Sequence, residues 1–410
     1  MNVSIWPKII ALVDMNCFFA AIEQRDHPAW RGQAVAVTNG RLGSTIITCS
    51  YEARAFGVHT GMRLREARQY CPGLIQAPSR PQIYAATSTA IMQALQQITP
   101  DLEVFSVDEA FLDLTHCQQL YQGPKDIGLR IKQLVKQASG GLLCSVGVSG
   151  DKTTAKFAAK RRKPDGLTII HPEDAARVLA PYPVTELSGI NKGIASFLRR
   201  YGVVLCGDMH KIPISILAQR YGNPGRRIWL MAQGLDPDKV QPQNRAPKSI
   251  GHGKVMPPET KDKRLILVYL QHMSEKVAGR LRQHQMQAEW FFIGIKTSNG
   301  WLKQTLSSGF YTDDGRLIYK MCRQFIYQCW QGQGVWQVQV TALSPRQGEQ
   351  YDLFMDLDEQ RARHEINEAI DSINQRFGEF AVAPASLLER SEMPNVIAPA
   401  WQPSGHRKTV

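Results

Sequence analysis

The pattern of apolar and polar positions predicts that residues 1–165 mix strands with helices. An apolar, β-branched run at 9–13 is typical of a buried strand, and it ends at Asp14. The run at 104–114 alternates between apolar and polar positions, so we expect a single strand with two adjacent acids at its centre. Further strands are predicted at 34–40, 44–50 and 142–149, and helices from about 18, from 51, and at 83–98, 124–139 and 151–162.

The remaining chain divides into a helical region and a mixed unit. Residues 174–237 are predicted to be mainly helical and too few for more than one helical core. The segment 234–249 is rich in proline and polar residues and lacks apolar periodicity, which is typical of a linker and predicts a boundary near 240. An α+β unit is predicted beyond it, with helices at about 262–284 and 315–331 and strands at 290–297 and 335–343.

Composition and charge favour a nucleic-acid partner. The 410 residues are 43% hydrophobic and 21% charged, which excludes a disordered or fibrous protein and indicates several domains. The excess of 49 Lys and Arg over 36 Asp and Glu gives a net charge of +13, which suits either nucleic acid or an anionic membrane surface. Because no stretch has about 20 apolar residues and no basic amphipathic anchor is evident, we expect no membrane contact.

The cysteine pattern bears on the compartment. Eight cysteines are scattered along the chain without a CxxC pair, so neither a disulfide framework nor a zinc site is indicated. This usage favours the reducing cytoplasm.

Three acids at strand positions are candidates for a metal site. Acids at the ends or centres of apolar strands are costly to bury unless a cation compensates them, and carboxylate oxygens suit Mg²⁺. If the strand that ends at Asp14 neighbours the one with Asp108 and Glu109, the three carboxylates converge and could hold two Mg²⁺ ions for in-line attack at a phosphorus. The alternative is that Asp14 caps the next helix and that the other two acids lie in a solvated turn.

Several polar residues suit a nucleoside triphosphate. Arg54 follows Tyr51 by three positions, so both project from one helix face, where they and the Thr48 hydroxyl could grip phosphate oxygens. Lys156 and the basic run at 160–163 form a helix end that could meet phosphate. An ordinary surface helix and a solvated basic face are the alternatives.

Three further features have both a functional and a structural interpretation. The rings of Phe18 and Phe19 could pack under a nucleotide sugar, although most such pairs belong to a core. The Gly-Ile turn with Gly189 and Lys192 could present N–H groups and an ammonium to a DNA phosphate, or simply connect two helices. The peptide QYDLF at 350–354 could dock into a partner's groove, or fold back onto the last unit.

The order of four motifs resembles a known family. DMNCFFA (14–20), YEARAFGVHTGM (51–62), SVDEAFLDL (106–114) and AKFAAKRRKPDG (155–166) occur in the order found in Y-family translesion DNA polymerases, most closely the bacterial DNA polymerase IV-like enzymes. The resemblance implies an α+β multidomain, right-hand polymerase with an antiparallel palm sheet, small fingers, a helical thumb and an α+β little finger. The implied boundaries are palm 1–19 and 79–165, fingers 20–78, thumb 166–237, linker 238–249, little finger 250–345, and clamp-binding motif with C-terminal tail 346–410.

The resemblance also implies roles for single residues. The metal-binding catalytic carboxylates match Asp14, Asp108 and Glu109, with two Mg²⁺ ions and the Met15 carbonyl as a backbone ligand. The residues that bind the incoming deoxynucleoside triphosphate match Thr48, Tyr51, Arg54 and Lys156, and the steric gate against ribonucleotides matches Phe19. The thumb turn that contacts DNA matches Gly189 and Lys192. The motif by which bacterial polymerases bind the sliding clamp matches Gln350, Leu353 and Phe354.

The chain departs from the family pattern at three places. Asn16 stands where many polymerase IV-like members carry Asp, and Asn191 stands where the thumb turn usually has Gly. The 56 residues after QYDLF make the tail more like that of the polymerase V catalytic subunit.

The expected function is template-directed, low-fidelity DNA synthesis past damaged bases, by a monomer acting on primer-template DNA. A catalytically inert accessory protein that binds DNA and the clamp is the main alternative. A palm-type nucleotide cyclase and a metal-dependent nuclease are the others.

Overall fold

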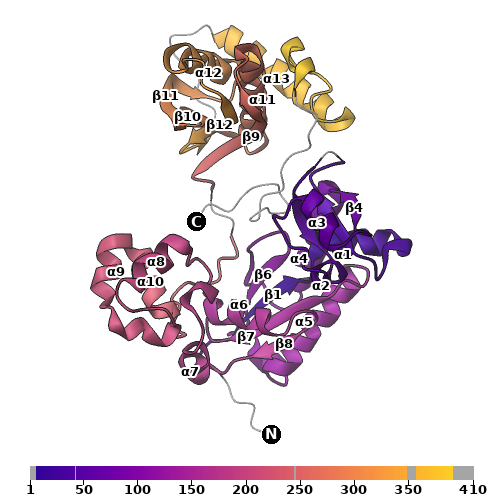
Figure 1. The fold of residues 1–410 in the computed structure, drawn as a ribbon, viewed down its shortest axis with the longest axis vertical. Helices are drawn as coiled ribbons and strands as arrows, with labels where there is room; N and C mark the ends of the chain where they lie inside the picture. Colours follow the sequence, from indigo (N-terminus) through magenta and orange to yellow (C-terminus); the bar gives the residue numbers. More distant parts are fainter. Residues whose placement is uncertain (1–5, 42, 244–245, 349–356, 391–410) are drawn as a thin grey trace. The chain divides into compact units, whose positions relative to one another are not determined.

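The computed structural model describes residues 6–41, 43–243, 246–348 and 357–390, which form two units that divide at positions 244 and 245 (Figure 1). Each unit has its own sheet and apolar core. All eight cysteines are free thiols. Within the described ranges, no helix combines the length and the apolar character needed to cross a membrane.

A five-stranded sheet forms the centre of the first unit. Its middle strand β1 (Ile10–Met15) pairs antiparallel with β6 (Glu109–Asp113) on one side and with β7 (Cys144–Ser149) on the other. Strands β5 (Leu102–Val104) and β8 (Leu167–Ile169) complete the order β5-β6-β1-β7-β8. The sheet is antiparallel except for β7 and β8, which run parallel.

The two faces of β1 are buried against different helices because successive side chains of a strand point to opposite faces. Its odd-numbered residues join the main core together with α4 (Pro81–Leu95) and α5 (Pro124–Ala138). The even-numbered Ile10 and Leu12 pack with Phe111 and with α6 (Lys152–Arg161). Asp14 shares their parity, so its side chain lies on the face of the sheet that α6 covers.

The prediction of one strand at 104–114 is wrong. The run contains only the last residue of β5, then a tight turn through residues 105–108, and then β6. Hydrogen bonds from the N–H groups of Phe105 and Ser106 to the Glu109 carbonyl (3.0 and 3.1 Å) close the turn. The turn itself contains the apolar residues Phe105 and Val107, so the apolar pattern did not mark it. As a result Asp108 lies in the turn and Glu109 begins the strand.

The predicted elements between 18 and 70 are present. Helix α1 (Phe18–Asp26) follows β1, and β2 (Val35–Thr38) pairs antiparallel with β3 (Ile46–Cys49). Helix α2 (Tyr51–Ala55) begins directly after β3, with the Ser50 side chain as its N-cap. In this part of the chain the sequence pattern did not predict α3 (Leu64–Tyr70) or β4 (Ile75–Pro78), which pairs parallel with β2.

Short helices form the rest of the first unit around a third apolar cluster. They are α7 (Ala175–Leu179), α8 (Lys192–Arg199), α9 (Ile214–Tyr221) and α10 (Asn223–Met231). Phe157 and Ala158 of α6 belong to this cluster, so α6 contacts both the sheet and the helices. The buried Lys152 also joins the two parts, because it pairs with Glu103 of β5 and with Asp238 beyond the helices, both at 2.8 Å.

The second unit is an antiparallel sheet with two long helices. Its strand order is β11 (Gly300–Thr312), β10 (Met286–Thr297), β12 (Val335–Leu343) and β9 (Ser249–Thr260), with the short β13 (Arg346–Gln347) paired to β10. Helices α11 (Lys263–Gln283) and α12 (Gly315–Cys329) contribute to its core. The predicted α+β unit is confirmed, although β9 and β11 were not expected.

A further helix, α13 (Leu357–Phe377), belongs to the second unit and was not predicted (Figure 1). It is held by Arg282 of α11, whose guanidinium donates two hydrogen bonds to the Asp371 carboxylate (2.6 and 2.8 Å). The QYDLF peptide at 350–354 lies outside the described residues.

Candidate active site

The three candidate carboxylates meet at one end of the central sheet. Asp14 of β1 is the direct cross-strand partner of Glu109 of β6, and the Met15 N–H donates to the Asp108 carbonyl (2.9 Å). Directly opposed residues of an antiparallel pair present their side chains on the same face. Asp14 and Glu109 therefore share the face that α6 covers, and Asp108 precedes them in the turn. The condition on which the metal prediction depended, that the two strands are neighbours, is met.

Two lysines supply the positive charge at these carboxylates. Lys163 Nζ lies 2.5 Å from Asp14 Oδ1, and Lys156 Nζ lies 2.6 Å from Glu109 Oε2. Lys156 comes from α6, and Lys163 lies just after the helix ends. The sequence analysis named Lys156 but treated Lys163 only as part of a basic run. Because Lys163 lies beyond the last turn of α6, helical spacing does not relate it to Lys156.

The carboxylates remain short of positive charge. Burial, followed by the neighbouring Glu109 carboxylate, raises the pKa of Asp108 to about 6, although the Ser106 hydroxyl donates to Asp108 Oδ1 (2.6 Å). Burial also raises the pKa of Asp14, with Glu109 adding to the shift and Lys163 opposing it. Acids whose pKa is raised by burial and by each other are the sites that a bound cation stabilises most.

The donor set fits hard divalent cations. Three carboxylates at one sheet end match the oxygen ligands that Mg²⁺ uses at phosphoryl-transfer sites. In the side-chain arrangement of the described residues, however, no three His, Cys, Asp or Glu groups are placed to hold a metal ion. In this arrangement two ammonium groups bind Asp14 and Glu109 individually.

Tyr51 and Arg54 lie together, as their spacing predicts. The Arg54 guanidinium lies 4.9 Å from the centre of the Tyr51 ring, and its Nε donates to the Cys49 carbonyl (3.2 Å). Thr48 lies on β3, next to the start of this helix. These two contacts orient the guanidinium of the exposed Arg54 and leave most of its N–H groups available to bind a ligand.

Asn16 connects the Tyr51 region to the carboxylate strand. Its amide group donates to the Ser145 hydroxyl at 3.0 Å and to the Tyr51 hydroxyl at 3.5 Å, while its carbonyl accepts from the Asp165 N–H at 2.7 Å. An aspartate could accept the last hydrogen bond but could not donate the other two. The departure from the family pattern therefore has a structural role in joining β1, β7 and the turn after α6.

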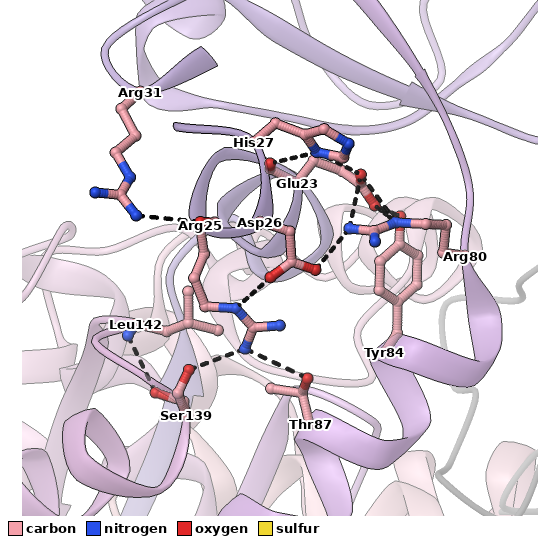
Figure 2. Close-up of polar contacts among 10 residues, drawn as sticks. All are labelled: Glu23, Arg25, Asp26, His27, Arg31, Arg80, Tyr84, Thr87, Ser139 and Leu142. Atoms are coloured by element: carbon pink, nitrogen blue, oxygen red, sulfur yellow. Dashed lines mark hydrogen bonds and ion pairs between the residues drawn. The ribbon is translucent and has the colours of Figure 1, made fainter. Parts of the chain in front are cut away.

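Phe19 packs against an aromatic ring that the sequence analysis did not name. The Phe19 ring stacks on Tyr84 of α4, with 4.3 Å between ring centres and 16° between planes. The Tyr84 hydroxyl donates to Glu23 Oε1 (2.6 Å), and Arg80 binds both oxygens of the same carboxylate (3.0 and 3.1 Å) (Figure 2). The spacing of Phe19 and Glu23 by four residues on one helix was the only signal in the sequence that they act together.

Gly189 and Lys192 lie at the turn that precedes α8. Gly189 has φ +94°, a conformation that favours glycine, and Lys192 is the exposed first residue of the helix. Asn191 is the N-cap, and its side chain accepts from the Ile194 N–H (3.0 Å). Asn191 therefore takes up one N–H group of the helix start, and Lys192 remains as the charged group at this turn.

Comparison with known proteins gives consistent matches to both units. The model of the impB/mucB/samB family matches residues 13–160, and the impB/mucB/samB family C-terminal domain matches residues 247–353. The chain is 34% identical over 391 residues to DNA polymerase IV of Moorella thermoacetica, covering 92% of this chain and 96% of that one. It is 32% identical over 389 residues to DNA polymerase IV of Pelotomaculum thermopropionicum, covering 92% and 95%.

A solved structure shares the fold. A Y-family DNA polymerase chimera matches with a TM-score of 0.71 and 26% sequence identity, covering 83% of this chain and all of that one. The resemblance seen in the four sequence motifs is thereby confirmed.

Proposed function

This chain belongs to the Y family of DNA polymerases, among relatives named DNA polymerase IV, and on that premise we propose that Asp14, Asp108 and Glu109 are its catalytic centre. It is a DNA-directed DNA polymerase of the translesion type. The observation that carries the proposal is the cross-strand pairing of Asp14 with Glu109, which brings the carboxylates of two distant motifs to one sheet end.

We propose that these carboxylates, with the Met15 carbonyl, hold two Mg²⁺ ions. Such ions lower the pKa of the primer 3′-hydroxyl and neutralise charge on the triphosphate and the pyrophosphate leaving group. The lysines that pair with Asp14 and Glu109 are then free to bind phosphate oxygens, since an ammonium serves either anion as a point charge. Lys163 thus joins Lys156 as a ligand of the incoming nucleotide.

The remaining nucleotide contacts follow the motif positions. Thr48, Tyr51 and Arg54 would bind the triphosphate, with the fork of Arg54 suited to two phosphate oxygens at once. Phe19 would lie against C2′ of the sugar and exclude a ribonucleotide hydroxyl. Replacing Phe19 by Ala should therefore admit ribonucleotides, and an unchanged sugar preference in a single-nucleotide extension assay would refute this role.

Contacts with DNA and with a partner protein complete the proposal. Gly189 and Lys192 would contact a DNA phosphate, so affinity for primer-template DNA should fall with salt. Gln350, Leu353 and Phe354 would bind a sliding clamp, and Leu353→Ala with Phe354→Ala should abolish clamp-dependent gains in processivity. We expect the protein to act as a monomer in the cytoplasm.

Primer extension tests the catalytic assignment. The wild type, Asp108→Ala and the control Glu173→Ala would be compared with Mg²⁺ on undamaged and abasic templates. The control removes an exposed acid outside the carboxylate cluster. We expect extension by the wild type and the control and none by Asp108→Ala. Extension that persists in Asp108→Ala would refute the metal assignment, and a folded, DNA-binding wild type without extension would support an inert accessory protein.

A further inference from the structure

Phe19 is connected to a buried carboxylate through Tyr84. The Phe19 ring stacks on the Tyr84 ring, and the Tyr84 hydroxyl donates a hydrogen bond to Glu23. Phe19 and Glu23 lie four residues apart on α1, and both face the start of α4. The Glu23 side chain is only 1% exposed, yet each of its two oxygens accepts a hydrogen bond. Tyr84 contributes its hydroxyl, and Arg80 contributes Nε and Nη2, the latter at 2.9 Å from Oε2 (Figure 2).

This arrangement fixes the Tyr84 ring at both of its ends. Its backbone belongs to the first turn of α4, and its hydroxyl is held by a charge-assisted hydrogen bond of 2.6 Å. These two contacts fix the long axis of the ring, so the ring cannot move sideways without breaking one of them. Since the Phe19 ring lies nearly parallel on Tyr84, the plane of Phe19 is set by the plane of Tyr84.

We propose that Glu23 is a positioning residue for sugar selection: through Tyr84 it holds Phe19 at the place where the ring excludes a 2′-hydroxyl. The inference rests on the proposed role of Phe19 as the steric gate. Glu23 acts only through Tyr84 and Arg80 and is assigned no contact with the nucleotide. Loss of the anchor lets the stacked pair tilt, and a ring displaced by a fraction of an ångström no longer excludes a single oxygen atom.

Conservative variants separate this role from general stability. Tyr84→Phe keeps the stacked ring and removes only the hydroxyl, and Glu23→Gln keeps the shape and removes the charge. Tyr121→Phe is the matched control, because its hydroxyl donates to the Ile98 carbonyl (3.1 Å), outside the Phe19 contacts. For each variant the ratio of kcat/KM for a deoxynucleotide to kcat/KM for the matching ribonucleotide would be measured, together with the unfolding midpoint in urea.

We expect Tyr84→Phe and Glu23→Gln each to lower the ratio by about tenfold, the effect of losing one hydrogen bond to a charged group. Tyr121→Phe should leave the ratio unchanged, whatever its effect on stability. Phe19→Ala, measured alongside, tests the gate itself. A ratio that falls in Phe19→Ala but not in Tyr84→Phe or Glu23→Gln would overturn the positioning role alone, whereas an unchanged ratio in Phe19→Ala would overturn the gate assignment and the inference with it.

Discussion

Two groups of acids in the first unit differ in how far the protein itself balances their negative charge. Glu23 accepts hydrogen bonds from Tyr84 and Arg80, so its charge is matched inside the protein. Asp14 is also buried and Asp108 is half-buried, but burial raises the pKa of both, although Lys163 pairs with Asp14. A carboxylate that is paired with donors of the protein itself stabilises the folded state. A carboxylate with too little positive charge near it is suited to bind a metal ion.

The largest expected effect comes from removing a charge at the catalytic centre. Asp108→Asn should lower the rate of nucleotide incorporation by on the order of 10³-fold, since it removes an electrostatic contact made in the transition state. Its free energy of unfolding should stay level or rise, because the variant relieves repulsion from Glu109. Single-turnover incorporation and urea unfolding measure the two quantities. A stability loss as large as the activity loss would show that Asp108 is a structural acid like Glu23.

At Glu23, whose charge is paired within the protein, we expect the loss of a partner to lower stability. Arg80→Met should lower the free energy of unfolding by about 2–3 kcal/mol, because the buried Glu23 carboxylate loses its arginine and keeps the Tyr84 hydroxyl and the His27 ring, 3.6 Å away. The estimate is reduced from that of a fully buried pair because the Arg80 side chain is 33% exposed. Urea unfolding of the variant and of Glu23→Gln/Arg80→Met provides the test. The double variant should recover part of the loss, and no recovery would mean that Arg80 stabilises through packing alone.

The pH dependence of stability sharpens the comparison. The pKa of Asp108 is about 6 in the folded protein and 3.8 in its unperturbed state, so the folded state holds the proton more tightly. Between these two values unfolding releases a proton, and the free energy of unfolding therefore falls as the pH rises. Relative to Asp108→Asn, the wild type should gain about 1 kcal/mol when the pH is lowered from 7.5 to 5. Urea unfolding with a chelator present checks the gain, and a difference that does not change with pH would contradict the raised pKa.

The sequence predicted the elements that carry a clear apolar signal. The strand ending at Asp14 was marked by a continuous apolar run because it is buried on both faces, and the helix starting at Phe18 and the short helix with Tyr51 and Arg54 are also present. One strand was predicted at 104–114 because the turn between β5 and β6 also contains apolar residues, Phe105 and Val107. Strand β4 was not predicted because only Ala77 of its four residues is buried, so it shows no apolar pattern.

The site could be predicted only as far as its motifs reach. The carboxylates lie in two continuous motifs, and their convergence follows from the pairing of two strands. The contacts of Glu23 with Arg80 and Tyr84 span 57 and 61 residues of chain, and no local pattern records them. Lys163 was missed for a related reason, since a basic run at a helix end has the same composition whether it is solvated or faces an acid.

The smallest effect on stability is expected at Asp26, a partly exposed second partner of Arg80. Asp26 also binds Arg80 (2.8 Å) and Arg25 (2.7 Å), but its side chain is 26% exposed and water can replace both partners (Figure 2). Asp26→Asn should therefore lower the free energy of unfolding by only about 0.5 kcal/mol, as for most ion pairs near the surface. Urea unfolding at low and high salt measures the loss, which should shrink further as salt screens the pair. A loss comparable to that of Arg80→Met would mean that Asp26, rather than the buried Glu23, is the principal partner of Arg80, and that burial does not set the strength of these contacts.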